Sequence, residues 1–347
     1  MAQPRESQVD IRYRYIIVGA GAVGGTIGGR LAQAGHDVVL VARGQHLQAL
    51  QTHGLDLVDP LTKRRLQIPA VSGPHELELT PRDILVLAVK SQDTVAALAA
   101  WSERLASGGS TAGEILPLFL AQNGVENERV ALRRFANVYS VCVWLPSVHL
   151  QPGLVVVRSA PISGVFVLGR YPGGSDDIAR AVARDLSESG FDAHTSNDVM
   201  RWKYSKLLRN LTNALDAIVA PEYDSSAVLE AATAEAQSVL RAAGIDAASA
   251  AEEEQLRSSI DLSREVPGLV EAGSSSWQSL VKGSRSIEVD YLNGEIVLLG
   301  RIHGIRTPIN SALQRIANDF AHNGAAPRSW SIEQMQKVID EEIHRAA

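Results

Sequence analysis

The chain has 347 residues, of which 45% are hydrophobic and 21% are charged, a composition typical of a globular protein long enough for about two domains. The formal net charge is −6 and no basic tract stands out, which disfavours nucleic acid and anionic membranes as partners. The single cysteine excludes an intramolecular disulfide, and no apolar run approaches the ~18 residues of a membrane span.

The chain begins with a polar stretch, residues 1–12, that lacks the apolar core of a signal peptide. We expect this stretch to be a flexible tail, and the protein to be soluble and cytoplasmic. The residues that follow, YIIV, predict a short strand, and GTIGGRLAQAG predicts a helix that ends at Gly35.

A glycine-rich turn, G-x-G-x-x-G, lies between that strand and that helix. In the dinucleotide-binding motif Gly19 would allow a tight turn, Gly21 would let the backbone approach a pyrophosphate, and Gly24 would let helix and strand pack closely. Because the motif occurs between a strand and a helix, it favours dinucleotide binding over a turn without a ligand. The candidate cofactor-binding residues are Gly19, Ala20, Gly21, Ala22, Val23 and Gly24.

The second predicted strand, DVVLVA, ends in Ala42-Arg43-Gly44. An NAD-binding site usually carries Asp or Glu at this point, to bind the ribose 2′-hydroxyl. An arginine would pair with a 2′-phosphate instead, so Arg43 favours NADP(H) as the cofactor. The alternative is an exposed surface arginine.

Two further strands, at residues 84–89 and 115–121, are continuously apolar, as expected in a parallel sheet covered on both faces. Lys90 follows the first strand and Asn123 follows the second. Ligands bind beyond the carboxyl ends of such strands, which favours a site role for both residues over a role in surface loops.

Residues 136–170 contain alternating β segments, NVYSVCVWLP, LVVVRSA and GVFVLGRY, and Cys142 in the first reads as a core residue. A helix, DDIARAVARDLSESG, follows. After Asp198 the pattern predicts helices only, at 201–215, 222–243, 247–258, 266–282, 286–303, 308–322 and 331–345. We therefore predict a tail at 1–12, an α/β dinucleotide-binding domain at 13–197 and an all-α domain at 198–347, with a site in the cleft between the two domains.

The helix predicted at 201–215, with Asp198 as its N-cap, has leucines on one face and a polar stripe of Lys206, Asn210 and Asn213 on the other. From the pattern alone, such a stripe is usually solvated. The pattern alone likewise suggests that Glu288 is solvated, because an acid on an amphipathic helix usually faces water. No His/Cys/Asp cluster has metal-ligand spacing, and no motif indicates a Ser/His/Asp hydrolase.

Six separated motifs nevertheless occur together in one order: GAGAVGG, the AVK that ends at Lys90, the QNG at Asn123, the KLLxN of residues 206–210, the serine cluster that ends at Ser276, and IEVDYLNG followed by GIRTPIN. In these motifs, from about residue 14 to residue 325, the chain resembles the ketopantoate reductases (2-dehydropantoate 2-reductases). The resemblance implies a Rossmann-type domain followed by an all-α domain, a fold like that of 6-phosphogluconate dehydrogenase. It also implies NADPH-dependent reduction of a small branched 2-oxo acid.

The resemblance implies that the polar stripe of Lys206, Asn210 and Asn213 faces the cleft between the domains instead of water. It further implies roles for individual residues. Lys206 would be the general acid, Asn210 would bind the substrate, and Ser276 would hold its carboxylate. Glu288 would contact the substrate hydroxyl or the cofactor ribose, and Lys90 and Asn123 would lie near the nicotinamide ribose and the substrate. The chemistry is coherent, because a lysine ammonium can stabilise and protonate the oxygen of a ketone that receives a hydride. Partial burial would lower the pKa of this lysine, and a nearby carboxylate such as Glu288 would raise it.

Three departures from the family pattern concern the substrate pocket. The second asparagine of the lysine helix is Asn213, one residue earlier than usual, which turns its amide by about 100° on a continuous helix. Gly273 replaces an asparagine, and VWLPSVHLQPG replaces small polar residues. A different 2-oxo acid or another ketone therefore remains an alternative, as do an opine-forming or 3-hydroxy-acid dehydrogenase and a non-catalytic NADP(H)-binding regulator. A homodimer through the helical domain is compatible with the sequence.

Overall fold

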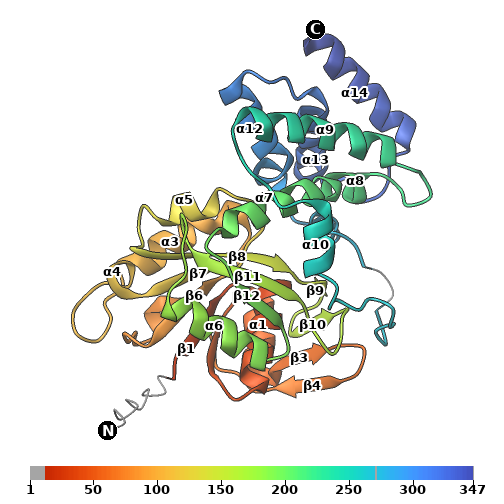
Figure 1. The fold of residues 1–347 in the computed structure, drawn as a ribbon. Helices are drawn as coiled ribbons and strands as arrows, with labels where there is room; N and C mark the ends of the chain where they lie inside the picture. The colour runs from red at the N-terminus through yellow and green to blue at the C-terminus, as the bar shows by residue number, and fades with distance from the viewer. Residues whose placement is uncertain (1–11, 270–271, 347) are drawn as a thin grey trace.

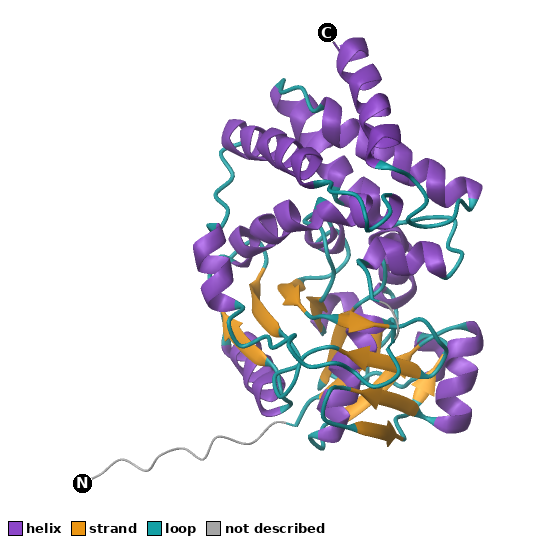
Figure 2. Cartoon of the chain, turned by 90° about the vertical axis from the view of Figure 1, so that its right-hand side faces the viewer, coloured by secondary structure: helices purple, strands orange, loops and turns teal. Residues whose placement is uncertain are grey.

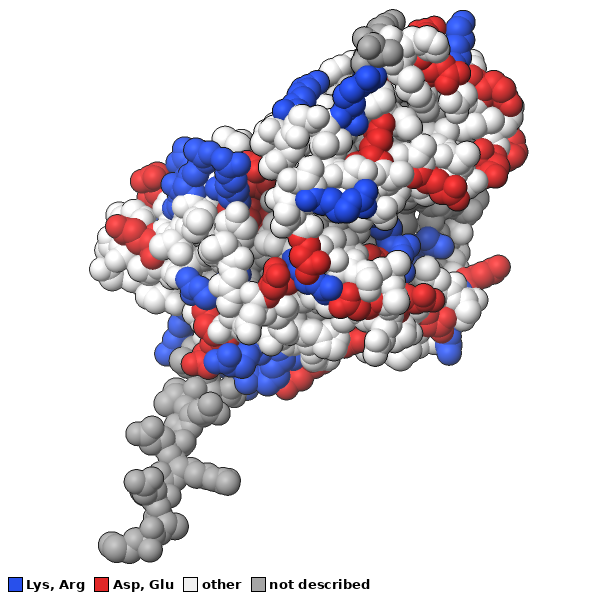
Figure 3. Space-filling model, turned by 45° about the horizontal axis from the view of Figure 1, so that its top comes forward, with Lys and Arg blue, Asp and Glu red and all other residues white. Residues whose placement is uncertain are grey.

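A computed structural model describes residues 12–269 and 272–346 (Figure 1). The expected tail at 1–12 thus lies outside the described residues, apart from Arg12. The strands lie in one half of the molecule, where helices flank them, and the other half is formed by helices and loops, as Figure 2 shows. Acidic and basic side chains both occur across the face of the molecule drawn in Figure 3. Among the described residues, no helix is both long enough and apolar enough to cross a membrane.

An eight-stranded sheet forms the centre of the first half. Its order is β12-β11-β8-β7-β6-β1-β2-β5, and its neighbouring strands are parallel except for the antiparallel pair β8–β11. The strands are β1 (Arg14–Val18), β2 (Asp37–Val41), β5 (Ala70–Val71), β6 (Asp83–Leu87), β7 (Pro117–Leu120), β8 (Asn137–Trp144), β11 (Val165–Arg170) and β12 (Asp192–Thr195). This arrangement confirms the predicted α/β half with a largely parallel sheet.

Both faces of this sheet are covered, which is why its strands are continuously apolar. In β1, Tyr15 and Ile17 belong to the core on one face, and Ile16 and Val18 belong to the core on the other. The helices of this half are α1 (Ala22–Gln33), α2 (Gly44–His53), α3 (Thr94–Ser102), α4 (Ala112–Ile115), α5 (Asn127–Ala131) and α6 (Asp177–Glu188). Cys142 is buried, as expected of a core residue.

A second, four-stranded sheet was not expected. Its order is β4-β3-β10-β9, and it consists of β3 (Leu55–Val58), β4 (Lys63–Leu66), β9 (Ser147–Val148) and β10 (Leu154–Val157). Strand β10 is the predicted segment LVVVRSA, but it pairs with β3 instead of joining the large sheet. The sequence pattern predicts that a strand exists, whereas its partner depends on contacts between distant segments.

The second half consists of helices α7 (Val199–Asn210), α8 (Thr212–Ile218), α9 (Ser226–Ala242), α10 (Ala250–Leu256), α11 (Ser275–Val281), α12 (Asn293–His303), α13 (Pro308–Asn323) and α14 (Ile332–Ala346). The side chain of Asp198 caps α7, as predicted, by accepting a hydrogen bond from the N–H of Arg201. Helix α7 packs against β8 and β11, so it lies directly on the sheet half (Figure 1).

Three predicted helices were wrong in part. The helix expected at 201–215 is interrupted at Leu211, whose N–H bonds the carbonyl of Leu208, three residues back instead of four. The helix expected at 266–282 begins only at Ser275, because the stretch before it contains Pro267 and two glycines. The segment expected to form one helix at 286–303 is divided into a 3₁₀ turn, η3 (Glu288–Tyr291), and the helix α12 that follows it.

Candidate active site

A cavity of about 730 Å³ extends from the glycine-rich turn to the first turn of α11. Its walls come from the turn itself, the residues that follow β2, β6 and β7, the end of β8, and helices α7 and α8. The cavity therefore lies between the sheet half and the helical half, where the sequence placed a site. The predicted residues on its wall are Gly19, Ala20, Gly21, Ala22, Val23, Arg43, Lys90, Asn123, Lys206, Asn210, Asn213 and Glu288.

The glycine-rich turn fits a dinucleotide. Gly19 has a φ of 102°, which favours glycine, and a Cβ at Gly24 would lie 2.0 Å from the carbonyl oxygen of Gly19. Gly24 is thus buried behind the wall, where it lets α1 pack closely on the turn. A Cβ at Gly21 would meet no atom within 4 Å, so this side of the turn faces open space at the N-terminus of α1. This combination of a tight turn, a close packing point and an open helix end suits a pyrophosphate.

Arg43 lies at the N-cap position of α2, is exposed, and borders the cavity. Arg43 is therefore exposed, as expected of a surface arginine, and it also lies on the cavity wall, as expected of a residue that binds a cofactor. The segment Ser72–Pro74, which follows β5, lines the same cavity.

Lys206 projects from α7 to the end of β8. Its Nζ donates a hydrogen bond of 2.8 Å to Oδ1 of Asn123 and another to the carbonyl oxygen of Val143. A lysine ammonium has three donors, so one remains without an acceptor among the described residues. Burial lowers the pKa of Lys206 to about 8, although the nearby thiol of Cys142 and the carboxylate of Glu253 oppose this shift. The shift has the expected direction and brings the pKa of the ammonium closer to neutral pH.

Glu288 faces Lys90 instead of Lys206. Its Oε2 lies 2.8 Å from Nζ of Lys90, and its Oε1 accepts hydrogen bonds of 3.1 Å from both the N–H and the Oγ of Ser91. Burial acts to raise the pKa of Glu288, but the charge of Lys90 and these hydrogen bonds hold the pKa below its usual range. Glu288 is 5% exposed, so the interpretation as a solvated acid on a helix was wrong. Its ion pair joins η3 to the residue that follows β6.

The polar stripe of α7 and α8 lines the cavity, as the family resemblance implied and in contrast to what the pattern alone suggests. Asn210 is 9% exposed and Asn213 is 8% exposed. Nδ2 of Asn210 has no hydrogen-bond partner among the described residues, and Nδ2 of Asn213 lies 3.5 Å from Oγ of Ser275. Leu211 keeps right-handed helical dihedral angles, φ −60° and ψ −26°, so the interruption changes the helical rotation only slightly. Asn213 itself, and not residue 214, lines the cavity together with Asn210.

Ser276 is the predicted site residue that the structure places elsewhere. It is 2% exposed and does not reach the cavity, whereas Ser274, Ser275 and Ser279 do. Ser274 caps α11 by accepting a hydrogen bond from the N–H of Trp277, so the next residues follow helical geometry. Successive helical residues differ in direction by about 100°, and this rotation sends Ser276 into the protein interior. The serine that faces the cavity beside Asn213 is Ser275.

Several cavity residues were missed by the sequence analysis. Trp144, Leu145 and Pro146 belong to a segment that the sequence marked only as a departure from a family pattern. Others come from loops or helix ends that carry no motif, so no local signal could have found them. These residues are Arg158, Arg257, Ile260, Leu262, Gln278 and Lys282.

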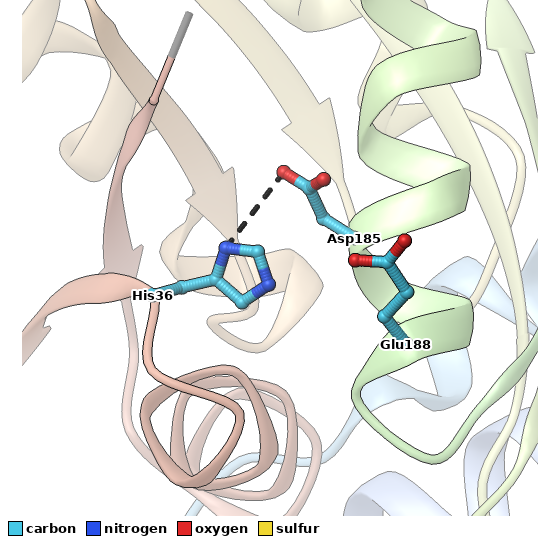
Figure 4. A group of neighbouring side chains, drawn as sticks. All are labelled: His36, Asp185 and Glu188. Carbon is cyan, nitrogen blue, oxygen red and sulfur yellow. Dashed lines mark ion pairs between the residues drawn. The ribbon is translucent and has the colours of Figure 1, made fainter. Parts of the chain in front are cut away.

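A separate group of polar side chains lies outside this cavity. His36, Asp185 and Glu188 bring ligand-type atoms within 4.8 Å of one another, as Figure 4 shows. Nδ1 of His36 lies 3.9 Å from Oδ2 of Asp185, and that same oxygen accepts a hydrogen bond of 2.6 Å from Tyr15. The hydrogen bond from Tyr15 gives Asp185 a structural role. Local spacing could not predict this group, because His36 follows α1 and the two acids lie on α6.

A glycine-rich turn on a largely parallel sheet, opposed by a helical half across a shared cavity, defines a class of dinucleotide-dependent oxidoreductases. Comparison with known families agrees. The model of the family "Ketopantoate reductase PanE/ApbA" matches residues 15–173, and that of "Ketopantoate reductase PanE/ApbA C terminal" matches residues 198–321. The chain belongs to the ketopantoate reductase family, a family of oxidoreductases whose cofactor is a nicotinamide dinucleotide.

Individual relatives cover most of the chain. A protein of Pyrococcus horikoshii named 2-dehydropantoate 2-reductase is 26% identical over 86% of this chain and 94% of its own length. The crystal structure of a PanE/ApbA family ketopantoate reductase from Ralstonia eutropha JMP134 is 28% identical, with a TM-score of 0.72, over 90% of this chain and 99% of its own. A D-mandelate dehydrogenase solved with NADH and anilino(oxo)acetate shares the fold, with 24% identity and a TM-score of 0.73, over 90% of this chain and 99% of its own.

Proposed function

We propose that this protein uses NADPH to reduce the keto group of a small branched 2-oxo acid, with 2-dehydropantoate as the leading substrate. The observation that carries the proposal is the placement of Lys206, a partly buried lysine on the wall of a dinucleotide-type cavity, whose ammonium is held by two hydrogen bonds and keeps one donor. Its desolvation lowers the pKa to about 8. Two relatives of this protein, one from Pyrococcus horikoshii and one from Halobacterium salinarum, suggest the substrate, because both are named 2-dehydropantoate 2-reductase.

In the proposed reaction each cavity residue has a separate role. When bound, the nicotinamide supplies the hydride that reaches the keto carbon. Lys206 donates its free proton to the keto oxygen, which becomes the hydroxyl of the product, and then regains a proton from solvent. Asn123 and the carbonyl of Val143 hold the ammonium in place while it acts. In this proposal Asn210, Asn213 and Ser275 bind the substrate oxygens, and Ser275 takes the role that the sequence suggested for Ser276.

The preference for the phosphorylated cofactor rests on Arg43. Its guanidinium, at the edge of the cavity after β2, is where a ribose 2′-phosphate would lie in a site of this type. Lys90, fixed by Glu288 and placed next to the glycine-rich turn, would contact the nicotinamide ribose.

We also propose that the chain divides near residue 197 into a cofactor domain, 13–197, and a helical domain, 198–347. The change from strands to helices at α7 and the bounds of the two family models support this division. Helix α7 would then be the element of the second domain that carries the proposed general acid, and it packs against the sheet of the first domain. The expected homodimer and the expected cytoplasmic location stay predictions.

The test is the oxidation of NADPH, followed at 340 nm, with 2-dehydropantoate and with a panel of 2-oxo acids of different side chains. Efficient turnover of 2-dehydropantoate, in preference to the rest of the panel, supports the proposal. Preferred turnover of another 2-oxo acid would keep the chemistry and replace the substrate. Tight NADPH binding without turnover of any 2-oxo acid would contradict the enzyme and favour the alternative of a non-catalytic regulator.

A further inference from the structure

The imidazole of His46, on α2, joins the glycine-rich turn to the loop between β9 and β10. Its Nε2 lies 2.8 Å from the carbonyl oxygen of Ala20, and its Nδ1 lies 2.9 Å from the backbone nitrogen of Gly153. His46 is partly buried and lines the cavity that would hold the cofactor. It has no role in the proposed reaction, and no motif marks it in the sequence.

These two contacts fix the tautomer of His46. The backbone N–H of Gly153 can only donate, so Nδ1 must be the nitrogen without a hydrogen. The carbonyl of Ala20 can only accept, so Nε2 must carry the hydrogen. The ring is therefore neutral, and both of its nitrogens have a partner. An imidazolium would carry a hydrogen on Nδ1 as well and would set it against the N–H of Gly153, so the geometry suits the neutral ring alone.

Gly153 is a firmly placed donor. Its φ of 76° lies in the left-handed region that favours glycine, and its carbonyl accepts a hydrogen bond of 2.8 Å from the N–H of Asp56, in β3. A Cβ at Gly153 would lie 3.1 Å from Cβ of Ala49, so the loop also packs closely on the helix that carries His46. The four-stranded sheet and α2 thus hold the N–H of Gly153 in place for Nδ1.

The other end of this bridge holds the peptide between Ala20 and Gly21. The N–H of Ala20 donates to the carbonyl of Val41, at the end of β2, and the carbonyl of Ala20 accepts from His46. Because this peptide is trans, the N–H of Gly21 points away from the carbonyl that His46 binds. Gly21 is the N-cap of α1, and the first N–H groups of a helix have no partner within it. His46 therefore helps to set the direction of the backbone donors that a pyrophosphate would meet.

Among the residues that the structure describes, the ionisable side chains that face His46 are those of His149 and Lys282. The ring centroids of His46 and His149 are 4.3 Å apart, and Lys282, which follows α11, lines the same cavity. Burial lowers the pKa of His46, the hydrogen bond to Ala20 opposes this shift, and the charge of Lys282 adds to it. Burial also lowers the pKa of His149 to about 4. Both rings are therefore neutral near pH 7.

We propose that His46 is a positioning residue for the cofactor, which holds the Ala20–Gly21 peptide in the orientation that presents the N-terminus of α1 to the pyrophosphate. His46 would act through this peptide, because its single N–H is already used by Ala20. The role requires the neutral ring, so acid should weaken cofactor binding through His46. This inference rests on the proposed function only for the cofactor, a nicotinamide dinucleotide, and not for the 2-oxo acid.

The test measures the affinity for NADP⁺ by calorimetric titration, which does not depend on turnover. His46→Phe keeps an aromatic ring but loses both hydrogen bonds, so we expect it to bind NADP⁺ about tenfold more weakly than the wild type at pH 8. His46→Gln has a carboxamide that can accept at one atom and donate at the other. It should bind NADP⁺ within about threefold of the wild type at pH 8, because it can restore the bridge.

The same titrations between pH 8 and pH 5 separate positioning by the neutral ring from a merely structural role. The affinity of the wild type should fall by about threefold or more relative to that of His46→Gln, because only the histidine can gain a proton. The 2′-phosphate of NADP⁺ also gains a proton in this range, but it does so with both proteins, so the ratio of the two affinities isolates His46.

His53→Gln is the matched control, because it changes an exposed histidine at the end of the same helix, outside the cavity. It should follow the wild type at every pH. A His46→Phe variant that binds NADP⁺ as tightly as the wild type would overturn the proposal. So would a ratio of the wild-type affinity to that of His46→Gln that does not change with pH. If His46→Phe does not fold, as judged by circular dichroism, this second comparison still decides the question.

Failure of the proposed function is a different result. NADP⁺ would then bind with the expected dependence on His46, while no member of the 2-oxo acid panel would oxidise NADPH. Normal turnover of 2-dehydropantoate, together with equal NADP⁺ affinities of the wild type and His46→Phe, would leave the proposed function intact and remove His46 from cofactor binding. A wild-type protein that binds no NADP⁺ at any pH would overturn both.

Discussion

Nζ of Lys206 lies 2.8 Å from Oδ1 of Asn123, and this contact joins helix α7 to the loop that follows β7. The two residues are far apart in the sequence, and each was singled out for a different reason. A second link between the same regions is the buried ion pair of Lys203, on α7, with Glu128, on α5. Together they fix the position of the ammonium relative to the sheet, and under the proposed function this position sets where a keto oxygen would be protonated.

Replacement of Lys206 by alanine should lower kcat by about 100-fold or more, because the general acid and its positive charge are lost together. The KM for NADPH should change much less, because the lysine contacts neither the glycine-rich turn nor Arg43. Steady-state kinetics with the best 2-oxo acid of the panel, alongside circular dichroism to verify the fold, measures both effects. A near-normal kcat would remove Lys206 from the chemistry.

The rate of reduction should fall as pH rises through about 8. Only the protonated ammonium can donate a proton, and burial lowers the pKa of Lys206 to about 8. Below this value kcat/KM should be level with respect to this group; well above it, the value should drop about tenfold per pH unit. The pH profile of NADPH oxidation between pH 6 and 10 measures this limb. A profile that is flat to pH 10 would contradict the assignment.

Arg43→Ala should weaken the binding of NADPH far more than that of NADH, because only NADPH carries the 2′-phosphate that the guanidinium would contact. Fluorescence titration of the wild type and the variant with both cofactors gives the two ratios. Arg104→Ala, a change at an arginine outside the cavity, is a suitable control and should leave both affinities unchanged. Equal losses for NADPH and NADH would refute the 2′-phosphate assignment.

Two glycines of the same motif should respond differently to alanine. In Gly24→Ala the new Cβ would lie 2.0 Å from the backbone oxygen of Gly19, so we expect a loss of folding stability of several kcal/mol. In Gly21→Ala the Cβ meets no atom within 4 Å, so the fold should persist while cofactor affinity falls. Chemical denaturation and cofactor titration of both variants separate the two effects. Equal stability losses would show that the turn adapts.

Glu295, near the start of α12, should make the folded protein less stable as pH rises. Burial, with the charge of Glu126, raises the pKa of Glu295 to about 7, above its usual value. The carboxyl group is thus held neutral in the folded state, and its contribution to the free energy of unfolding is complete below about pH 4.5 and lost by about pH 7. Glu295→Gln should therefore be more stable than the wild type at pH 8, by up to about 3 kcal/mol, and similar to it at pH 4.5.

Urea denaturation at the two pH values measures this difference. Glu254→Gln removes an exposed acid from α10 and should change the free energy of unfolding little at either pH. A Glu295→Gln variant whose stability parallels the wild type at both values would show that Glu295 ionises freely in the folded protein.

The sequence alone determined the elements whose signal is local. The strand, glycine-rich turn and helix around Gly21 were predicted because each glycine is required by contacts within one βα unit. The strands that precede Lys90 and Asn123 and the largely helical second half follow from short apolar patterns. The parallel sheet then follows from simple rules, and those rules place both strand-end residues at one rim.

Tertiary structure decided what depends on contacts between distant segments. The pairing of β10 with β3, the choice of Ser275 over Ser276 and the pairing of Glu288 with Lys90 follow from such contacts, and no local pattern encodes them. Contacts between distant segments also decide whether the stripe of Lys206, Asn210 and Asn213 faces water or a cavity. An amphipathic pattern shows that a helix has two faces, but only the packing of α7 against β8 shows what the polar face meets. Arg257 is a further case, since it follows α10 in the sequence and lines the cavity only through the way α10 is placed in the fold, and nothing in its own neighbourhood of the sequence marks it.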